Sequence, residues 1–405
     1  MYGHGMNKPN AGLELGGGEI NHARIVQALY ELGPLSRADL ARLTGFSRAT
    51  IGTAVAGLLT RGVLAEGDTR RSSAAGGKPS RPLWFAPDAP PIAAAHLLPG
   101  SVEAALISAG GELLKTARRT FPTDSPDGTA ATDSVLTALT EILDGGRTPV
   151  GIGIAVGGMV DTDTGTIVQV ALAPCLDGLP IGQLVAKHFD LPAWIDLHPR
   201  VQALGDRWFG QGRGHATFAS LYTGETLGVG LVVGGVVQRG AAGSGGEIGH
   251  TTVQVDGKPC RCGRSGCWET IATLRWLQAE ALRLGLPGAA SLSAGPLARL
   301  AARGHPHAAE LLDRYAHNIA IGMANLHQTF APGLFILHGD TVAGGEALRS
   351  RIERHLHKAI PAHPAGPPQV AFTTLDDHAT LLGAAGLVLS YSLQPPRSAR
   401  PARRS

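Results

Sequence analysis

The stretch GEIGHTTVQVDGKPCRCGRSGCWE, residues 246–269, contains three of the four cysteines in a chain of 405 residues. Cys260, Cys262 and Cys267 lie within eight positions of one another, and His250 precedes the first of them by ten. One imidazole and three thiolates complete the tetrahedral coordination of Zn²⁺ and leave no position for water. We therefore expect a structural zinc site with His250, Cys260, Cys262 and Cys267 as its ligands.

A disulfide framework is the first alternative for these cysteines, but it needs an even set of thiols and an oxidising compartment. The first residues, MYGHGMNKPN, hold no apolar run of the signal-peptide kind. No stretch of about 18 apolar residues, the length that crosses a membrane, occurs later. We therefore expect a cytoplasmic protein without membrane contact. A core histidine beside three free thiols is the remaining alternative.

Composition divides the chain into segments. Hydrophobic residues make up 43% of the chain and charged residues 17%, which suffices for ordinary cores. Residues 1–86 carry ten Lys and Arg against six Asp and Glu, and the last eleven residues, PPRSARPARRS, carry four arginines and no acid. We expect a flexible Gly-rich segment at 1–18, a small helical unit with a basic hairpin at 19–86, an α/β region at 87–392 and a disordered basic tail at 393–405.

The unit at 19–86 begins with the pattern of three short helices. EINHARIVQALYELG (19–33) is amphipathic and ends at Gly33-Pro34. Ser36 with Asp39 predicts a capping box for the second helix, Gly45 a tight turn and Ser47 the cap of the third. The expected inward residues are Ile20, Ala23, Ile25 or Val26, Leu29 or Tyr30, then Ala38, Leu40, Ala41, Leu43, Ile51, Val55, Leu58 and Leu59. This is the helix-turn-helix pattern.

The third helix would read DNA. Its first turn presents Ser47, Arg48 and Thr50 to bases and phosphates when the helix lies in a major groove. GVLAEGD (62–68) and RPLWFAP (81–87) predict two strands around a basic loop, which is a wing. The candidate backbone or minor-groove contacts of that wing are Arg70, Arg71, Lys78 and Arg81. A helical protein-interaction module is the alternative, and the caps, the polar first turn and the basic wing together favour DNA.

Short apolar runs alternate with helical patterns from about residue 92 onward, which is typical of an α/β fold. Two Gly-rich strand-turn units, VGIGIAVGG (150–158) and LGVGLVVGG (227–235), indicate two lobes. TLLGAAGLVLS (380–390) predicts a helix whose Gly and Ala residues permit close packing against a neighbour.

With these motifs in place, the chain resembles the ROK family of repressors and sugar kinases. Residues 246–269 match the zinc-loop signature of that family almost residue for residue, and the resemblance extends over about residues 19–392. The helix-turn-helix with its GGKPSRPLWF wing (76–85) is similar to that of the repressor branch. The resemblance implies a winged helix-turn-helix followed by a two-lobed actin-like kinase fold. It also implies a cytoplasmic homodimer or homotetramer.

The same resemblance bears on catalysis, because kinases of the family need a carboxylate at the phosphates and a second one as base. Aligned on the family patterns, His96 and Leu98 stand where Asp and Gly belong, and Leu197 and His198 stand where an Asn-Asp pair belongs. A neutral or cationic imidazole does not replace a carboxylate as a Mg²⁺ ligand. Other departures are Arg200 and Leu172 at Asn positions and Asp340 at a Gly position. We therefore expect no phosphoryl transfer.

Glu247, His250 and Glu269 match three sugar-contacting positions of the family, and carboxylates accept hydrogen bonds from sugar hydroxyls. The two glutamates could equally persist only as neighbours that orient the zinc ligands. The sequence thus predicts a regulator, most simply a repressor, that binds double-stranded operator DNA, with a sugar or another small molecule as its candidate effector. An ATP-dependent sugar kinase and a zinc-stabilised scaffold are the alternatives.

Overall fold

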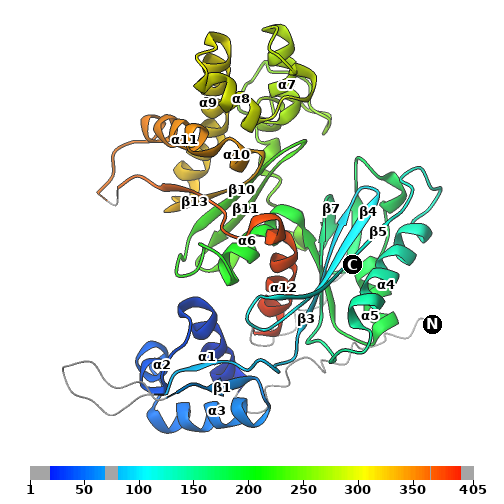
Figure 1. The fold of residues 1–405 in the computed structure, drawn as a ribbon, viewed down its shortest axis with the longest axis vertical. Coiled ribbons are helices and arrows are strands. Elements are labelled where there is room, and N and C mark those ends of the chain that lie inside the picture. Colours follow the sequence, from blue (N-terminus) through cyan, green and yellow to red (C-terminus); the bar gives the residue numbers. More distant parts are fainter. Residues whose placement is uncertain (1–18, 69–80, 365, 394–405) are drawn as a thin grey trace, which may run out of the picture. The chain divides into compact units, whose positions relative to one another are not determined.

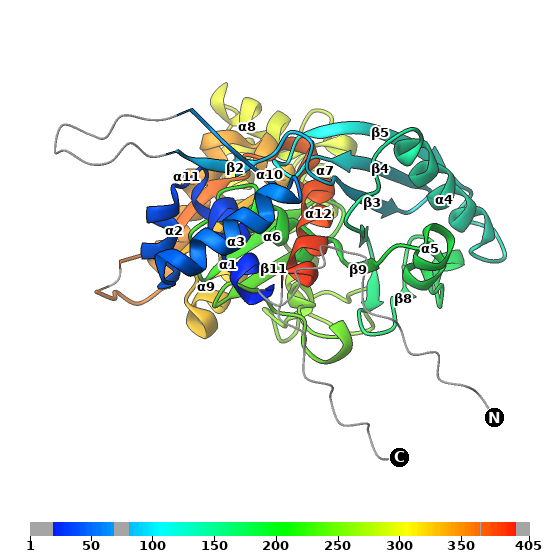
Figure 2. The same ribbon diagram turned by 90° about the horizontal axis from the view of Figure 1, so that it is seen from below.

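The computed structural model describes residues 19–68, 81–364 and 366–393. We call residues 19–68 and 81–86 the head. It contains three helices, α1 (Glu19–Leu32), α2 (Arg37–Thr44) and α3 (Arg48–Thr60), and two short strands, β1 (Leu64–Glu66) and β2 (Leu83–Phe85). The strands pair antiparallel, with Leu64 opposite Phe85. Figures 1 and 2 show this arrangement, which confirms three helices followed by two paired strands.

The helices of the head begin and end where local signals place them. The Ser36 hydroxyl accepts the Asp39 N–H at 3.2 Å and the Asp39 carboxylate accepts the Ser36 N–H at 3.1 Å, so the capping box is complete. Gly45 ends α2 in the left-handed region at φ 73°. The Ser47 hydroxyl accepts the Thr50 N–H at 3.1 Å and caps α3. The predicted helix boundaries are confirmed.

The core of the head differs from the prediction at two positions. Leu40 is fully buried, whereas Ala38 and Leu43 are exposed, so their assignment to the inner face was wrong. The helix α2 is only two turns long and meets α1 and α3 through a narrow stripe centred on Leu40. A leucine three positions later, in the last turn, lies outside that stripe. The buried members of the predicted core are Ala23, Ile25, Val26, Leu29, Tyr30, Leu40, Ile51, Val55 and Leu58.

The first lobe has a five-stranded sheet in the order β5-β4-β3-β6-β9. Its strands are β3 (Ile92–Leu98), β4 (Ser101–Ile107), β5 (Leu113–Thr120), β6 (Ile152–Val156) and β9 (Ala193–Leu197). The strand β3 pairs antiparallel with β4 and parallel with β6. The remaining elements are α4 (Thr129–Leu143), which packs on β3, β4 and β5, the hairpin β7 (Met159–Asp161) and β8 (Thr166–Gln169), and α5 (Ile181–Phe189).

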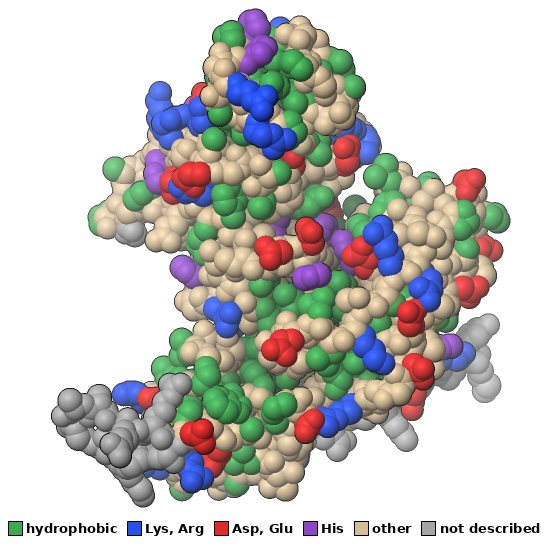
Figure 3. Space-filling view, in the orientation of Figure 1, with side chains coloured by type: hydrophobic (Ala, Val, Ile, Leu, Met, Phe, Trp, Pro, Cys, Tyr) green, Lys and Arg blue, Asp and Glu red, His purple; other side chains and the backbone are tan. Residues whose placement is uncertain are grey.

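The helix α12 (Ala379–Ser392) closes the first lobe by the close packing that its small residues predict. A Cβ added at Gly153 of β6 would lie 1.9 Å from the carbonyl oxygen of Ala384, so no larger residue fits at this crossing. On the face drawn in Figure 3, Lys and Arg side chains are interspersed with Asp and Glu. In the sheet of this lobe, Arg118 of β5 pairs with Glu103 of the neighbouring β4 at 3.2 Å.

The second lobe has a five-stranded sheet in the order β12-β11-β10-β13-β14, in which two antiparallel pairs precede a parallel one, as in the first lobe. Its strands are β10 (Phe218–Thr223), β11 (Leu227–Val233), β12 (Val236–Val237), β13 (Leu334–Gly339) and β14 (Gln369–Phe372). An antiparallel run of three strands again continues into parallel ones. Its helices are α6 (His198–Trp208), α7 (Leu274–Arg283), α8 (Ala294–Ala302), α9 (Pro306–Phe330), α10 (Asp340–Ala343) and α11 (Gly345–Ala359).

Two sheets of the same order confirm the two-lobed α/β prediction. Two compact units divide the chain: one runs to Asp196 and resumes at Thr380, and the other spans Leu197–Ala379. The predicted segment 87–392 is therefore built from two separately packed sheets. The boundaries predicted at residues 18, 86 and 392 stay predictions, and the segments 1–18 and 394–405 lie outside the described residues.

Candidate functional site

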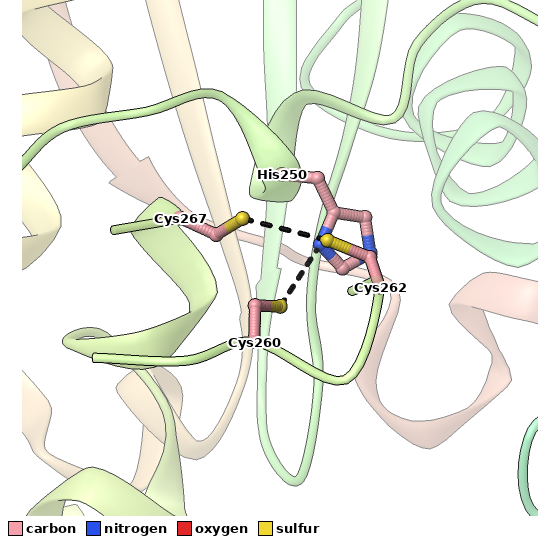
Figure 4. Close-up of side chains that lie close together, drawn as sticks. All are labelled: His250, Cys260, Cys262 and Cys267. Atoms are coloured by element: carbon pink, nitrogen blue, oxygen red, sulfur yellow. Dashed lines mark hydrogen bonds between the residues drawn. The ribbon is translucent and has the colours of Figure 1, made fainter. Parts of the chain in front are cut away.

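The second lobe gathers the four predicted metal ligands, as Figure 4 shows. His250 ends a short turn (Ile248–His250), Cys260 and Cys262 lie in the loop that follows, and Cys267 directly precedes another turn (Trp268–Thr270). Their ligand atoms all lie within 4.8 Å of one another. The Cys260 sulfur lies 3.5 Å from His250 Nδ1, and the Cys262 and Cys267 sulfurs lie 3.6 Å apart.

These distances fit a tetrahedral zinc site. With Zn–S bonds of about 2.3 Å and Zn–N bonds of about 2.0 Å, a tetrahedron has S–S edges of about 3.8 Å and N–S edges of about 3.5 Å. The measured edges of 3.6 Å and 3.5 Å agree with both values. The sequence thus brings the predicted donors into an arrangement that can hold a metal ion.

Backbone contacts explain why the loop folds back on itself. The Cys260 N–H donates to the Arg264 carbonyl at 2.7 Å, and Pro259 pairs with Ser265 in an isolated bridge. Gly266 has a φ of 72°, and an added Cβ there would lie 1.7 Å from the Gln254 carbonyl oxygen. Only glycine fits at that position, so the hairpin that carries the thiols depends on it.

Charge near the thiols also suits a metal site. Partial burial opposes the shift, but hydrogen bonds from the backbone and side chain of Arg264 lower the pKa of Cys262 to about 6. Burial, together with the neighbouring Cys262 and Cys260, raises the pKa of Cys267 to about 12. The Arg264 guanidinium also donates to the His250 carbonyl at 2.7 Å. One arginine thus orients the loop and, at Cys262, favours thiolate, the form that binds metal.

Trp268 anchors the loop in the core of the second lobe. Its side chain is fully buried, and its Nε1 donates to the Asn318 carbonyl of α9 at 2.8 Å. The indole lies against Gly322 of the same helix, where an added Cβ would come within 2.2 Å of two ring carbons. Since Trp268 follows Cys267 directly in the chain, the packing of the indole in the core also fixes the position of the metal ligand Cys267.

The two predicted effector carboxylates have different environments. Glu269 is 5% exposed, and its Oε2 accepts the Leu227 N–H at 3.4 Å. Its Oε1 lies 3.8 Å from an Arg261 nitrogen and 3.7 Å from an Arg275 nitrogen. Glu247 is half-buried at the start of the turn that contains His250. The structure thus places all three predicted effector residues on the zinc loop or beside it.

Arg200 supports the segment that leads into Glu247, a role that the sequence did not suggest. Its side chain is 1% exposed, and its guanidinium donates to the carbonyls of Gly243 and Gly245, both at 2.8 Å. The family pattern marks this position only as a lost Asn. The arginine instead donates hydrogen bonds to backbone carbonyls of a Gly-rich loop and so fixes the path of that loop. Arg275 was missed as well, because no local motif surrounds it.

The structure describes four of the seven predicted DNA contacts of the head. Ser47 and Thr50 lie at the start of α3, where their hydroxyls are 2.8 Å apart and serve the cap. Arg48 is exposed at the first position of the same helix. Arg81 lies 3.5 Å from the Glu66 carboxylate. Arg70, Arg71 and Lys78 lie outside the described residues.

Residues at the family's kinase positions do not offer carboxylates where phosphate chemistry needs them. His96 is buried in β3, and burial lowers its pKa to about 4, so the imidazole is neutral at pH 7. Burial raises the pKa of Asp340 to about 6, and both of its carboxylate oxygens accept the Ala294 N–H, at 3.0 and 3.1 Å. That carboxylate therefore caps α8. No helix in the described part of the chain is both long and apolar enough to cross a membrane.

Comparison with known proteins agrees with these observations. The xylose repressor of Bacillus subtilis is 23% identical over 383 residues, 93% of this chain and 96% of that protein. A putative xylose repressor of Caldicellulosiruptor sp. is 30% identical over 258 residues, but the match covers only 64% of its length. A glucokinase of Halalkalibacterium halodurans is 27% identical over 305 residues, 71% of this chain and 92% of that enzyme. This alignment covers less of the chain than the Bacillus repressor does.

A solved ROK-family transcriptional regulator, a homologue of the Escherichia coli MLC protein, superposes with a TM-score of 0.77. It is 23% identical, and the match covers 93% of this chain and 96% of that structure. The sequence model of the ROK family matches residues 100–391. The chain therefore belongs to the ROK family and shares its full-length architecture with a transcriptional regulator of that family.

Proposed function

We propose that the chain is a DNA-binding transcriptional repressor whose two lobes sense a small molecule. The observation that carries this proposal is the head, in which two capped helices flank a tight turn and the second begins with the exposed Arg48. Full-length similarity to a xylose repressor supports the same function. A homodimer or homotetramer in the cytoplasm would present paired heads to a palindromic operator, with half-sites about one helical turn apart or a multiple of it.

In the proposed DNA complex, α3 enters the major groove. We expect Arg48 to donate two hydrogen bonds to a guanine, and Arg70, Arg71 and Lys78 of the wing to contact the DNA backbone. Arg81 contributes less, because its guanidinium is within 3.5 Å of the Glu66 carboxylate. Operator binding would therefore depend on salt through the wing and on base sequence through Arg48.

Zinc has a structural role in this proposal. His250, Cys260, Cys262 and Cys267 would hold it, and the bound ion would cross-link the loop without an open coordination position. Trp268 and Arg264 couple the loop to the core and to the ligand set. The loop so fixed keeps Glu247 and Glu269 in place, either as contacts to the effector or as supports of the zinc ligands.

The effector that this site suits is a sugar or another small hydroxylated molecule. Glu247 is the better candidate contact, because Glu269 is already engaged by Arg261, Arg275 and the Leu227 N–H. A ligand that binds only the folded state raises the melting temperature. We expect one sugar of a panel to do so in the wild type and in Glu269→Gln, and to lose its effect in Glu247→Gln. The same loss in both variants would mean that both carboxylates contact the ligand.

The experiment that tests the proposal is selection of DNA by the full-length, zinc-loaded chain from a random pool. We expect enrichment of a palindromic sequence. Failure to enrich any sequence, at low salt as well as at physiological salt, would contradict it.

A sugar kinase is the second candidate, because glucokinases align with 71% of the chain. The neutral His96 in β3 argues against it, since no carboxylate stands there to hold the metal-bound phosphates. Incubation with ATP, Mg²⁺ and the same sugar panel tests this function. We expect no sugar-dependent ADP formation above background. ADP formation that a substitution in either lobe abolishes, but that persists when the head is deleted, would establish kinase activity.

A further inference from the structure

The arginines of the head differ in what they contact. Arg37 and Arg81 both pair with the Glu66 carboxylate, and Arg42 pairs with Asp39 three residues before it. These three arginines therefore share two carboxylates of the head. Arg24 and Arg48 have no carboxylate partner among the residues that the structure describes.

Arg24 is held in place by an aromatic ring. It is exposed on α1, and its guanidinium carbon lies 5.4 Å from the centroid of the Phe46 ring. Phe46 is half-buried between Gly45, which ends α2, and Ser47, which caps α3. This contact places a cation from the first helix beside the segment that leads into the third. A guanidinium over a ring face still has N–H groups at its edge that can donate to another acceptor.

We propose that Arg24 is a DNA-phosphate contact that complements Arg48 across the turn. This rests on the proposed DNA-binding function and assigns to α1 a part in it. Arg48 reads a base from the first turn of α3, and Arg24, which the Phe46 ring holds beside that turn, donates to a phosphate of the flanking backbone. A phosphate contact fixes the position of a recognition helix but carries no sequence information.

The proposal has a quantitative signature. Each phosphate neutralised in B-DNA contributes about 0.9 to the slope of log K against log salt. Arg24→Ala should therefore lower the magnitude of that slope by about 0.9. Between 50 and 200 mM salt, the variant would lose about 3.5-fold less affinity than the wild type loses. The ratio of affinities for operator and scrambled DNA should stay nearly constant, because every sequence has phosphates.

The test uses the full-length, zinc-loaded chain and an operator selected from random DNA, with affinity measured by fluorescence anisotropy from 50 to 200 mM KCl. Arg42→Ala is the matched control, since it removes an exposed arginine of the same head whose charge is already paired with Asp39. We expect an unchanged slope for Arg42→Ala, a reduced slope for Arg24→Ala, and recovery of the slope in Arg24→Lys.

Phe46→Leu keeps an apolar side chain but removes the ring face. We expect it to weaken binding by less than Arg24→Ala does, without a change in the order of preferred sequences. Thermal unfolding of each variant shows whether the head is still folded at the temperature of the assay. An Arg24→Ala slope equal to that of the wild type in a folded chain would overturn the proposal. A wild type that selects no DNA would overturn the proposed function itself, and the contact with it.

Discussion

Gly322 of α9 gives the sharpest test of how the zinc loop is joined to the core. A Cβ added there would lie 2.2 Å from two ring carbons of Trp268 and 2.4 Å from a third, whereas carbon atoms pack at about 3.5 Å. The ring would have to move by more than about 1 Å, but it is fully buried and its Nε1 is bonded to the Asn318 carbonyl. Overpacking of this kind costs about 1–3 kcal/mol, and the lost indole hydrogen bond adds about 1 kcal/mol.

The higher helix propensity of alanine offsets about 1 kcal/mol of this cost, so Gly322→Ala should lower the free energy of unfolding by about 1–3 kcal/mol. Urea unfolding followed by circular dichroism measures it. Gly333→Ala is the matched control in the same lobe, since no atom lies within 4 Å of its added Cβ and its φ is ordinary. We expect a near-neutral effect there. Equal stability of the two variants would refute the packing argument, and unchanged zinc retention in Gly322→Ala would refute the coupling of the loop to the core.

Three further predictions concern titration and metal binding. His96 has a pKa of about 4 in the folded protein against 6.5 in the unfolded chain. Its contribution to stability, about 3 kcal/mol, is therefore lost as pH falls from 6.5 to 4. His96→Leu should remove this part of the acid sensitivity, as measured by unfolding at a series of pH values. Asp340 has the opposite sign, because its raised pKa of about 6 makes the charged form costly above pH 6; Asp340→Asn should raise the free energy of unfolding at pH 7.5 by up to about 3 kcal/mol. Elemental analysis should find one zinc per chain, lost in Cys267→Ser and retained in Cys175→Ser, whose thiol lies outside the cluster. Wild-type behaviour of His96→Leu, Asp340→Asn or Cys267→Ser in its assay, or loss of zinc in Cys175→Ser, would contradict the corresponding argument.

The parts of the molecule that were predictable from sequence are those fixed by residues close together in the chain. Ser36, Gly45 and Ser47 act within four residues of themselves, so the helix boundaries of the head follow directly from them. The metal ligands likewise fall within one loop, between His250 and Cys267.

Contacts between distant residues were not predictable. Arg200 reaches carbonyls more than forty positions later, at Gly243 and Gly245, and nothing around it in the sequence indicates that pairing. The prediction that Leu43 is buried at the end of a short helix was wrong for a related reason. Whether Leu43 is covered depends on what packs against the end of α2, and hydrophobic periodicity does not contain that information.

In the proposed function, the head recognises a specific DNA sequence through the start of α3. The most direct measurement is the affinity of the full-length chain, wild type and Arg48→Ala, for its selected operator and for a scrambled duplex at one salt concentration. We predict that the wild type prefers the operator, and that Arg48→Ala loses about 1–3 kcal/mol of that preference while it keeps its affinity for scrambled DNA within a few-fold. Equal preference in the two proteins, or no preference in the wild type, would contradict the claim.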